Sequence, residues 1–130
     1  RLTEAMAEVV HLFVRREMWG YESCSEQPDT KAIIAGKYQG LRMAFGYPAT
    51  PDHSLKREAF DLLNAQLMTE MRLTENFMIN PGEALCGMMV ADEAARYFAV
   101  GAIDEEQLKD YAKRRGFAKE QMRKILPKNI

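Results

Sequence analysis

The chain has 130 residues, of which 47% are hydrophobic and 28% are charged, and its formal net charge is −1. This length and composition indicate one globular domain with a core of its own. The nearly neutral charge argues against a nucleic-acid-binding protein. No apolar run approaches the roughly 20 residues of a membrane-spanning helix, and no segment has the pattern of a secretory signal peptide.

The first helix is predicted over residues 2–18, where apolar side chains recur at helical spacing and Gly20 follows. A shorter helix is expected over residues 29–37. The segment 40–51 contains two glycines and two prolines, so we expect an ordered loop there. Asp52 or Ser54 then caps a helix that ends near residue 71.

The polar side of the first helix carries Glu4, Glu8, His11 and Arg15. Charged side chains on one face of a helix are usually solvated. We therefore expect this face to be exposed, and we do not expect its imidazole and carboxylates to bind a metal ion.

Three strands are predicted next, over residues 73–79, 84–90 and 96–102. The first two are separated by a turn at residues 80–82, and the last two by a short polar connection at residues 91–95. Consecutive strands with short connections favour an antiparallel meander.

Two helices complete the predicted fold. Asp104 and Gln107 have the spacing of a capping box, and Gly116 ends the helix that they begin. The last helix spans residues 118–126 and is ended by Pro127. The order of helices, strands and helices indicates an α+β domain, with a small antiparallel β-sheet flanked by helices.

The two cysteines, Cys24 and Cys86, are too few for a disulfide framework and have no nearby histidine pair for zinc. We therefore expect a reducing, cytoplasmic setting. The sequence begins with Arg1, inside a helical pattern and without a cap before it. We expect the chain to be part of a longer protein.

The segment 37–53 is the richest in groups that bind ligands, whereas the common hydrolase, phosphate-loop and metalloprotease motifs are absent. Arg42 can pair with a carboxylate through two parallel hydrogen bonds, and Gly46 permits close approach of the backbone. Tyr47 can stack on an adenine or cover a sulfonium. His53 is expected to cap or pack the loop. The chain therefore looks like a binding module, although a structural loop with a surface arginine has the same composition.

Several ordered blocks of the sequence resemble the activation domain of cobalamin-dependent methionine synthase. RMAFGY at residues 42–47 matches RxxxGY, the S-adenosylmethionine-binding signature of that family. The other blocks are RLTEA at 1–5, WGY at 19–21, LTENF at 73–77, PG at 81–82, RYFAV at 96–100 and DYAKR at 110–114. The likeness covers essentially the whole of residues 1–130, which are identified as the C-terminal part of that domain.

The resemblance implies a function in reactivating the methyltransferase. In the family, cobalamin held by a neighbouring domain oxidises occasionally to an inactive state, and flavodoxin or a flavoprotein reductase supplies an electron. S-adenosylmethionine then donates a methyl group, so that homocysteine can again be converted to methionine. The resemblance places zinc only in a distant domain of the parent enzyme. The chain alone is not expected to be catalytic.

The resemblance also assigns ligand contacts by position. It implies that Arg42 binds the methionine carboxylate and that Gly46 and Tyr47 line the pocket. Tyr97 matches the first of two paired tyrosines of the family, and Phe98 stands where the second is usually tyrosine.

Two further positions complete the comparison with the family. Glu4 matches a glutamate that lies near the ligand and could meet its amino group or sulfonium, although an exposed helix-face glutamate fits the sequence as well. Gly36 stands where some relatives carry an acidic residue near the ligand.

The segment from residue 104 onward carries eight Lys and Arg residues against five acidic ones. This excess could steer an acidic flavoprotein, or it could simply keep a helix face solvated. Two other functions remain open from the sequence: a module that docks a flavoprotein or corrinoid protein without binding the nucleotide, and a related factor that activates corrinoid proteins.

Overall fold

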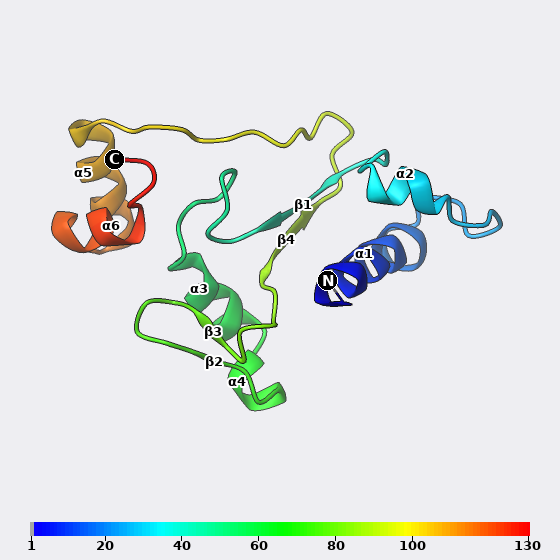
Figure 1. The fold of residues 1–130 in the computed structure, drawn as a ribbon, viewed down its shortest axis with the longest axis horizontal. Coiled ribbons are helices and arrows are strands. Elements are labelled where there is room, and N and C mark those ends of the chain that lie inside the picture. Colours follow the sequence, from blue (N-terminus) through cyan, green and yellow to red (C-terminus); the bar gives the residue numbers. More distant parts are fainter. Residues whose placement is uncertain (1) are drawn as a thin grey trace. The chain divides into compact units, whose positions relative to one another are not determined.

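The computed structural model describes residues 2–130. The chain forms two compact units, one of residues 1–42 with 88–96, and one of residues 43–87 with 97–130. Figure 1 shows the order of helices and strands along the chain. Within residues 2–130, no helix has both the length and the apolar composition that a membrane span requires.

The first unit begins with α1 (Leu2–Phe13), which continues as the π-helical turn η1 (Val14–Met18). The predicted helix over residues 2–18 is therefore confirmed, with a change of hydrogen bonding in its last turn. The second helix, α2 (Thr30–Ile34), is shorter than expected. Its N-cap is Asp29, whose carboxylate accepts hydrogen bonds from the amides of Lys31 and Ala32.

The prediction for the faces of α1 was wrong. His11 and Arg15 are 0% exposed, whereas Leu2 and Val9 on the apolar side are 89% and 61% exposed. The polar side is buried because Tyr38 and Glu22 of the first unit pack against it. The hydrophobic spacing located the helix correctly but did not identify the face that is covered.

A strand lies inside the segment that was predicted to be an ordered loop. β1 (Leu41–Ala44) is hydrogen-bonded to β4 (Gly87–Val90) in a two-stranded sheet. A Cβ atom at Gly87 would collide with the Met43 carbonyl oxygen, so the close approach of the strands requires glycine there. The strand was missed because the glycines and prolines around it dominate the sequence pattern.

The predicted strand over residues 73–79 is a hairpin. β2 (Arg72–Leu73) pairs antiparallel with β3 (Ile79–Asn80). Between them, the Thr74 amide donates a 2.8 Å hydrogen bond to the Met78 carbonyl. Phe77 in the turn has a positive φ of 58° and is buried. Burial of this ring explains why the apolar alternation resembled that of a single strand.

The predicted third strand, over residues 96–102, joins neither sheet. Its backbone is held elsewhere, because the Val100 amide donates a 2.9 Å hydrogen bond to the Pro48 carbonyl. The expected meander of three strands is therefore replaced by two separate two-stranded sheets.

The helix expected to end near residue 71 is divided into α3 (Leu55–Leu62) and α4 (Ala65–Met68). Asn64 interrupts it in the left-handed conformation, with φ of 48°. Asparagine tolerates this conformation better than most residues. At the start of α3, the Asp52 carboxylate accepts hydrogen bonds from both the amide and the hydroxyl of Ser54.

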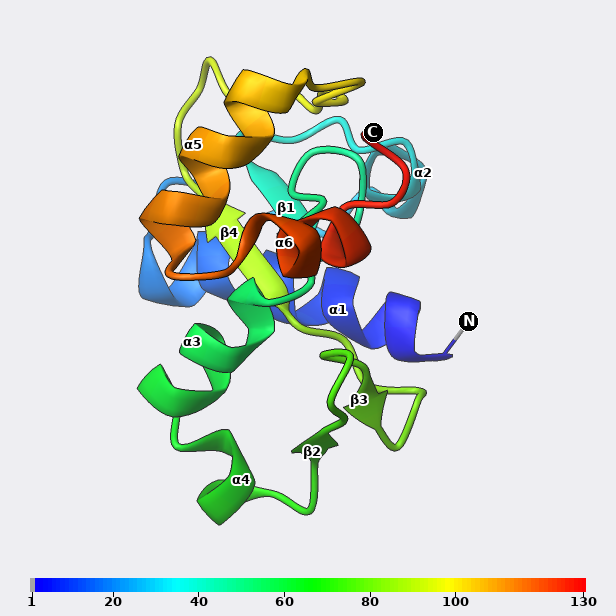
Figure 2. The same cartoon turned by 90° about the vertical axis from the view of Figure 1, so that its left-hand side faces the viewer.

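The core of the second unit lies between α5 (Glu105–Arg115) and α6 (Lys119–Ile125), which pack side by side (Figure 2). The capping box of Asp104 and Gln107 is confirmed, as is the left-handed Gly116 that ends α5. The buried cluster between these helices consists of Leu108, Ala112, Met122 and Leu126. The α+β class, with a small antiparallel sheet and flanking helices, is confirmed.

Candidate ligand-binding site

Arg42 lies in β1 and points toward α1. Its Nη2 atom donates a 2.6 Å hydrogen bond to Oε1 of Glu8 and lies 4.0 Å from Oε2 of Glu4. The Nε atom of Arg42 is buried and has no hydrogen-bond partner among the described residues. The structure thus brings two predicted ligand contacts, Arg42 and Glu4, into one cluster and leaves a guanidinium donor free.

Glu8 connects this arginine to Tyr38. The Tyr38 hydroxyl donates a 3.2 Å hydrogen bond to Oε2 of Glu8, while Oε1 accepts the bond from Arg42. The phenol near this carboxylate is partly buried, and burial followed by the charge of Glu8 raises the pKa of Tyr38. Neither Glu8 nor Tyr38 was predicted to belong to the site.

The ring of Tyr38 is held by two buried residues of the first helix. The Arg15 guanidinium carbon lies 3.9 Å from the ring centroid, and the His11 ring meets it edge-on at 5.0 Å. Burial, followed by the positive charge of Arg15, lowers the pKa of His11 to about 4. The imidazole is therefore neutral near pH 7 and adds no positive charge beside the two arginines.

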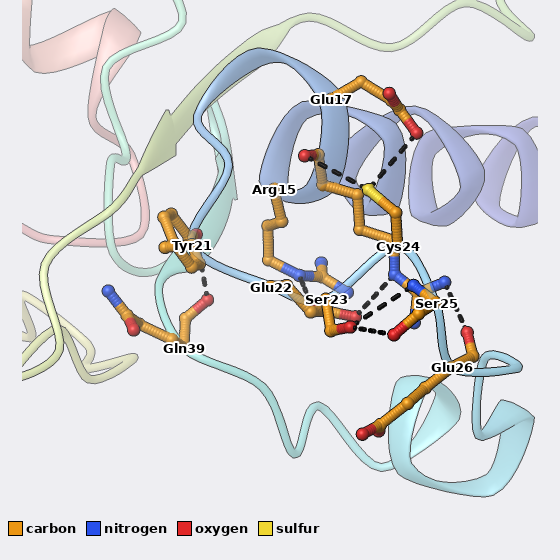
Figure 3. A network of polar contacts seen from close by, with 10 residues as sticks. Arg15, Glu17, Tyr21, Glu22, Ser23, Cys24, Ser25, Glu26 and Gln39 are labelled. Carbon is orange, nitrogen blue, oxygen red and sulfur yellow. Dashed lines mark hydrogen bonds and ion pairs between the residues drawn. The ribbon is translucent and has the colours of Figure 1, made fainter.

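Arg15 is fixed in turn by the segment that follows the helix (Figure 3). Its Nε atom donates a 2.6 Å hydrogen bond to Oε2 of Glu22. In the same view, the Tyr21 hydroxyl donates to the carbonyl of Gln39, at 3.3 Å. These contacts hold Arg15 in place and anchor the residue that follows Tyr38. The spacing of Glu4, Glu8, His11 and Arg15 over successive helical turns places them on one face, but it does not show that this face is covered.

In the second unit, Gly46 and Tyr47 form a tight turn directly after β1. The Gly46 amide donates a 2.7 Å hydrogen bond to the Thr50 carbonyl, and the Thr50 hydroxyl donates to Ala44. Gly46 has φ of +91°, and a Cβ atom there would collide with the His53 ring. Glycine is therefore required in this turn for both its conformation and its lack of a side chain.

His53 is itself oriented by Lys56. The Lys56 ammonium lies 2.7 Å from Nδ1 of His53 and donates to the Phe77 carbonyl at 3.2 Å. Burial, followed by the charge of Lys56, lowers the pKa of His53, and burial also lowers the pKa of Lys56. His53 therefore packs as a neutral ring against Gly46.

The predicted aromatic contacts lie in the second unit and are exposed. Tyr47, Tyr97 and Phe98 each leave about half of their surface in solvent. Gly46 and Tyr47 also line a cavity of about 1090 Å³ in this unit. Within residues 2–130, no cluster of three or more histidine, cysteine or acidic side chains could hold a metal ion.

Comparison with known proteins identifies the family. Residues 1–116 match the model of the vitamin B12-dependent methionine synthase activation domain. The chain belongs to this family. A crystal structure of the MetH reactivation domain bound to AdoHcy is similar with a TM-score of 0.92 and 38% sequence identity. The match covers 100% of this chain and 40% of that one, so this chain spans less than half the length of that relative.

In this activation domain, the loop after the RxxxGY motif is tied to α5 by a buried carboxylate. Oδ2 of Asp52 accepts hydrogen bonds from the Tyr111 hydroxyl at 2.7 Å and from Nε of Arg115 at 3.1 Å. Arg115 also donates to the Ser54 hydroxyl and pairs with Glu58. Sequence reasoning considered Asp52 only as a helix cap, because nothing local indicates partners about 60 positions away.

Proposed function

We propose that this activation domain binds S-adenosylmethionine through its methionine carboxylate at Arg42. The observation that supports this most directly is the guanidinium of Arg42, which is partly exposed and is held by Glu8 through Nη2 alone. An arginine carries five N–H donors in a planar fork that matches a carboxylate. The AdoHcy bound in the related crystal structure has the same amino-acid carboxylate and lacks only the transferable methyl group.

The other proposed contacts follow the chemistry of the ligand. Glu4 lies 4.0 Å from Arg42 and has an exposed carboxylate, which suits an ammonium or sulfonium beside the bound carboxylate. The exposed rings of Tyr47, Tyr97 and Phe98 are proposed to contact the adenosine portion and the sulfonium. Phe98 can stack in the same way as tyrosine, but it has no hydroxyl to donate.

We propose that the bound ligand serves the reductive reactivation of a cobalamin-dependent methionine synthase. The proposed partners are the cobalamin-binding domain of the parent enzyme and a flavodoxin or flavoprotein reductase. Cobalamin supplies the metal centre that is reduced and methylated, whereas this domain positions the methyl donor. Of the eight basic residues after position 104, half are in ion pairs within the chain: Arg114, Arg115, Lys119 and Arg123.

The first experiment is a calorimetric titration of S-adenosylmethionine into the full-length protein and its Arg42→Ala variant. We expect the variant to bind about 1.5–3 kcal/mol more weakly, because a hydrogen bond between charged groups is lost. Arg114→Ala is the matched control, since Arg114 is an exposed arginine whose contacts are an ion pair with Asp110 and the ring of Tyr111. Its affinity should equal that of the unmodified protein.

Either of two results would reject the proposal. Unchanged affinity in Arg42→Ala would remove the assigned carboxylate contact. No saturable binding by the unmodified protein, under conditions where the MetH reactivation domain binds AdoHcy, would favour a docking module that binds no nucleotide.

A further inference from the structure

We propose that Glu8 is a positioning residue, which presents the guanidinium of Arg42 to the ligand carboxylate. The inference rests on the proposed function and adds a residue that the RxxxGY motif does not contain. Glu8 contacts Arg42 at 2.6 Å from a rigid helix, whereas Arg42 itself projects from a strand of four residues. Its role would be exerted through Arg42 and not by contact with the ligand.

The two oxygens of Glu8 are used in different ways. Oε1 accepts from Nη2 of Arg42, and Oε2 accepts from the Tyr38 hydroxyl. The carboxylate is therefore fixed from both sides and cannot rotate without losing one bond. It engages a single nitrogen of Arg42, so Glu8 leaves the other donors of this partly exposed guanidinium unused.

Buried residues hold Tyr38, the second partner of Glu8, in place. The Tyr38 ring has the Arg15 guanidinium on its face and the His11 ring at its edge, and both of these residues are 0% exposed. Arg15 is held by Glu22 at 2.6 Å. Packing thus limits the movement of Tyr38, and Tyr38 limits the movement of Glu8.

Fixing Arg42 in this way favours binding for a physical reason. Arginine has a long side chain with many rotamers, and ordering it on binding reduces affinity. A guanidinium that is already held in the bound orientation avoids this loss. Tyr38 also matters indirectly, since its hydroxyl keeps Glu8 aligned with Arg42.

The test compares two ligands that differ at the amino-acid end. S-adenosylhomocysteine has the carboxylate, whereas 5′-methylthioadenosine keeps the adenosine and thioether but has no amino-acid portion. In the full-length protein, we expect Glu8→Gln to weaken S-adenosylhomocysteine about 3–10-fold, as for a weakened charged hydrogen bond. Binding of 5′-methylthioadenosine should not change. Tyr38→Phe should show the same selectivity with a smaller loss.

Two controls separate positioning from a general structural effect. Glu26→Gln makes the same chemical change at an exposed residue of the first unit and should alter neither affinity. In the double variant Glu8→Gln with Arg42→Ala, the loss should equal that of Arg42→Ala alone, because Glu8 acts only through Arg42.

Three results would overturn the inference. Tighter binding of S-adenosylhomocysteine by Glu8→Gln would mean that Glu8 competes with the ligand for Arg42. Equal weakening of both ligands would mean that Glu8 only maintains the fold. Additive losses in the double variant would mean that Glu8 acts independently of Arg42. Absence of S-adenosylhomocysteine binding by the unmodified protein is distinguishable from these, because it rejects the proposed function itself.

Discussion

Helices α1 and α5 are both amphipathic, but they bury opposite faces. α5 buries Leu108 and Ala112 against α6 and leaves most of its charged side chains in solvent. α1 and its continuation η1 bury His11 and Arg15, and α1 leaves its apolar stripe exposed. The two helices therefore contribute differently to the protein, although their hydrophobic spacing is of the same kind.

The difference reflects the free energy of each contact. Burying apolar surface contributes about 25 cal/mol per Å², so the α5–α6 contact stabilises the second unit. A buried charge loses hydration, and its ion pairs often do no more than offset that loss. The polar face of α1 is therefore poorly explained by stability, which agrees with the proposal that its contacts with Tyr38 and Arg42 orient a binding group.

The largest effect is expected for Asp52, whose buried carboxylate binds Tyr111 and Arg115 of α5. Asp52→Ala should lower the free energy of unfolding by about 3–5 kcal/mol, because it leaves Arg115 without its buried partner and removes the acceptor of Tyr111. Chemical denaturation followed by circular dichroism measures the change. Asp110→Ala removes an exposed ion pair on the same helix and should cost less than about 1 kcal/mol. Similar losses in both variants would show that the Asp52 network is solvated.

The second prediction compares the apolar faces directly. Leu108→Ala should destabilise the protein by about 2–5 kcal/mol, because a fully buried side chain is replaced by a cavity. Val9→Ala, on the exposed stripe of α1, should change stability by no more than about 0.5 kcal/mol. Both values come from the same denaturation experiment. A loss at Val9 as large as that at Leu108 would show that the α1 stripe is covered in solution.

The α5 region could be predicted from the sequence because its signals are local. Asp104 and Gln107 satisfy each other across one helical turn, and Gly116 ends the helix through its own backbone conformation. The covered face of α1 could not be predicted in this way. It depends on Tyr38 and Arg42, which lie 30 or more positions from Glu8 in the sequence.

The candidate site, like the fold, was predicted only in part from the sequence. The motif pointed to Arg42 and Gly46, and the family resemblance added Glu4, which lies 4.0 Å from Arg42; their contacts with a ligand stay predictions. The contacts of Glu8 and Asp52 were missed because their partners lie far away in the sequence and are brought near by the fold. For the same reason, short strands such as β1 were hidden by the glycines and prolines around them.

The smallest expected effect concerns the buried imidazole of α1. In the folded state His11 has a pKa of about 4, against 6.5 as the ordinary value. Because the unfolded chain binds the proton more readily, stability is fully present above pH 6.5 and is lost as the pH falls toward 4. Protonation of His11 should lower the free energy of unfolding by about 2–3 kcal/mol.

His11→Leu should remove this part of the pH dependence, since leucine does not titrate. Above pH 7 the variant should be at least as stable as the unmodified protein, because neither ring nitrogen of His11 has a partner among residues 2–130. The measurement is the difference in unfolding free energy between the two proteins at several pH values, in which most contributions from other titrating groups cancel. A difference that stays constant between pH 7 and pH 4 would mean that His11 is hydrated in the folded protein. The contrast between the polar face of α1 and the apolar face of α5 would then rest on Arg15 alone.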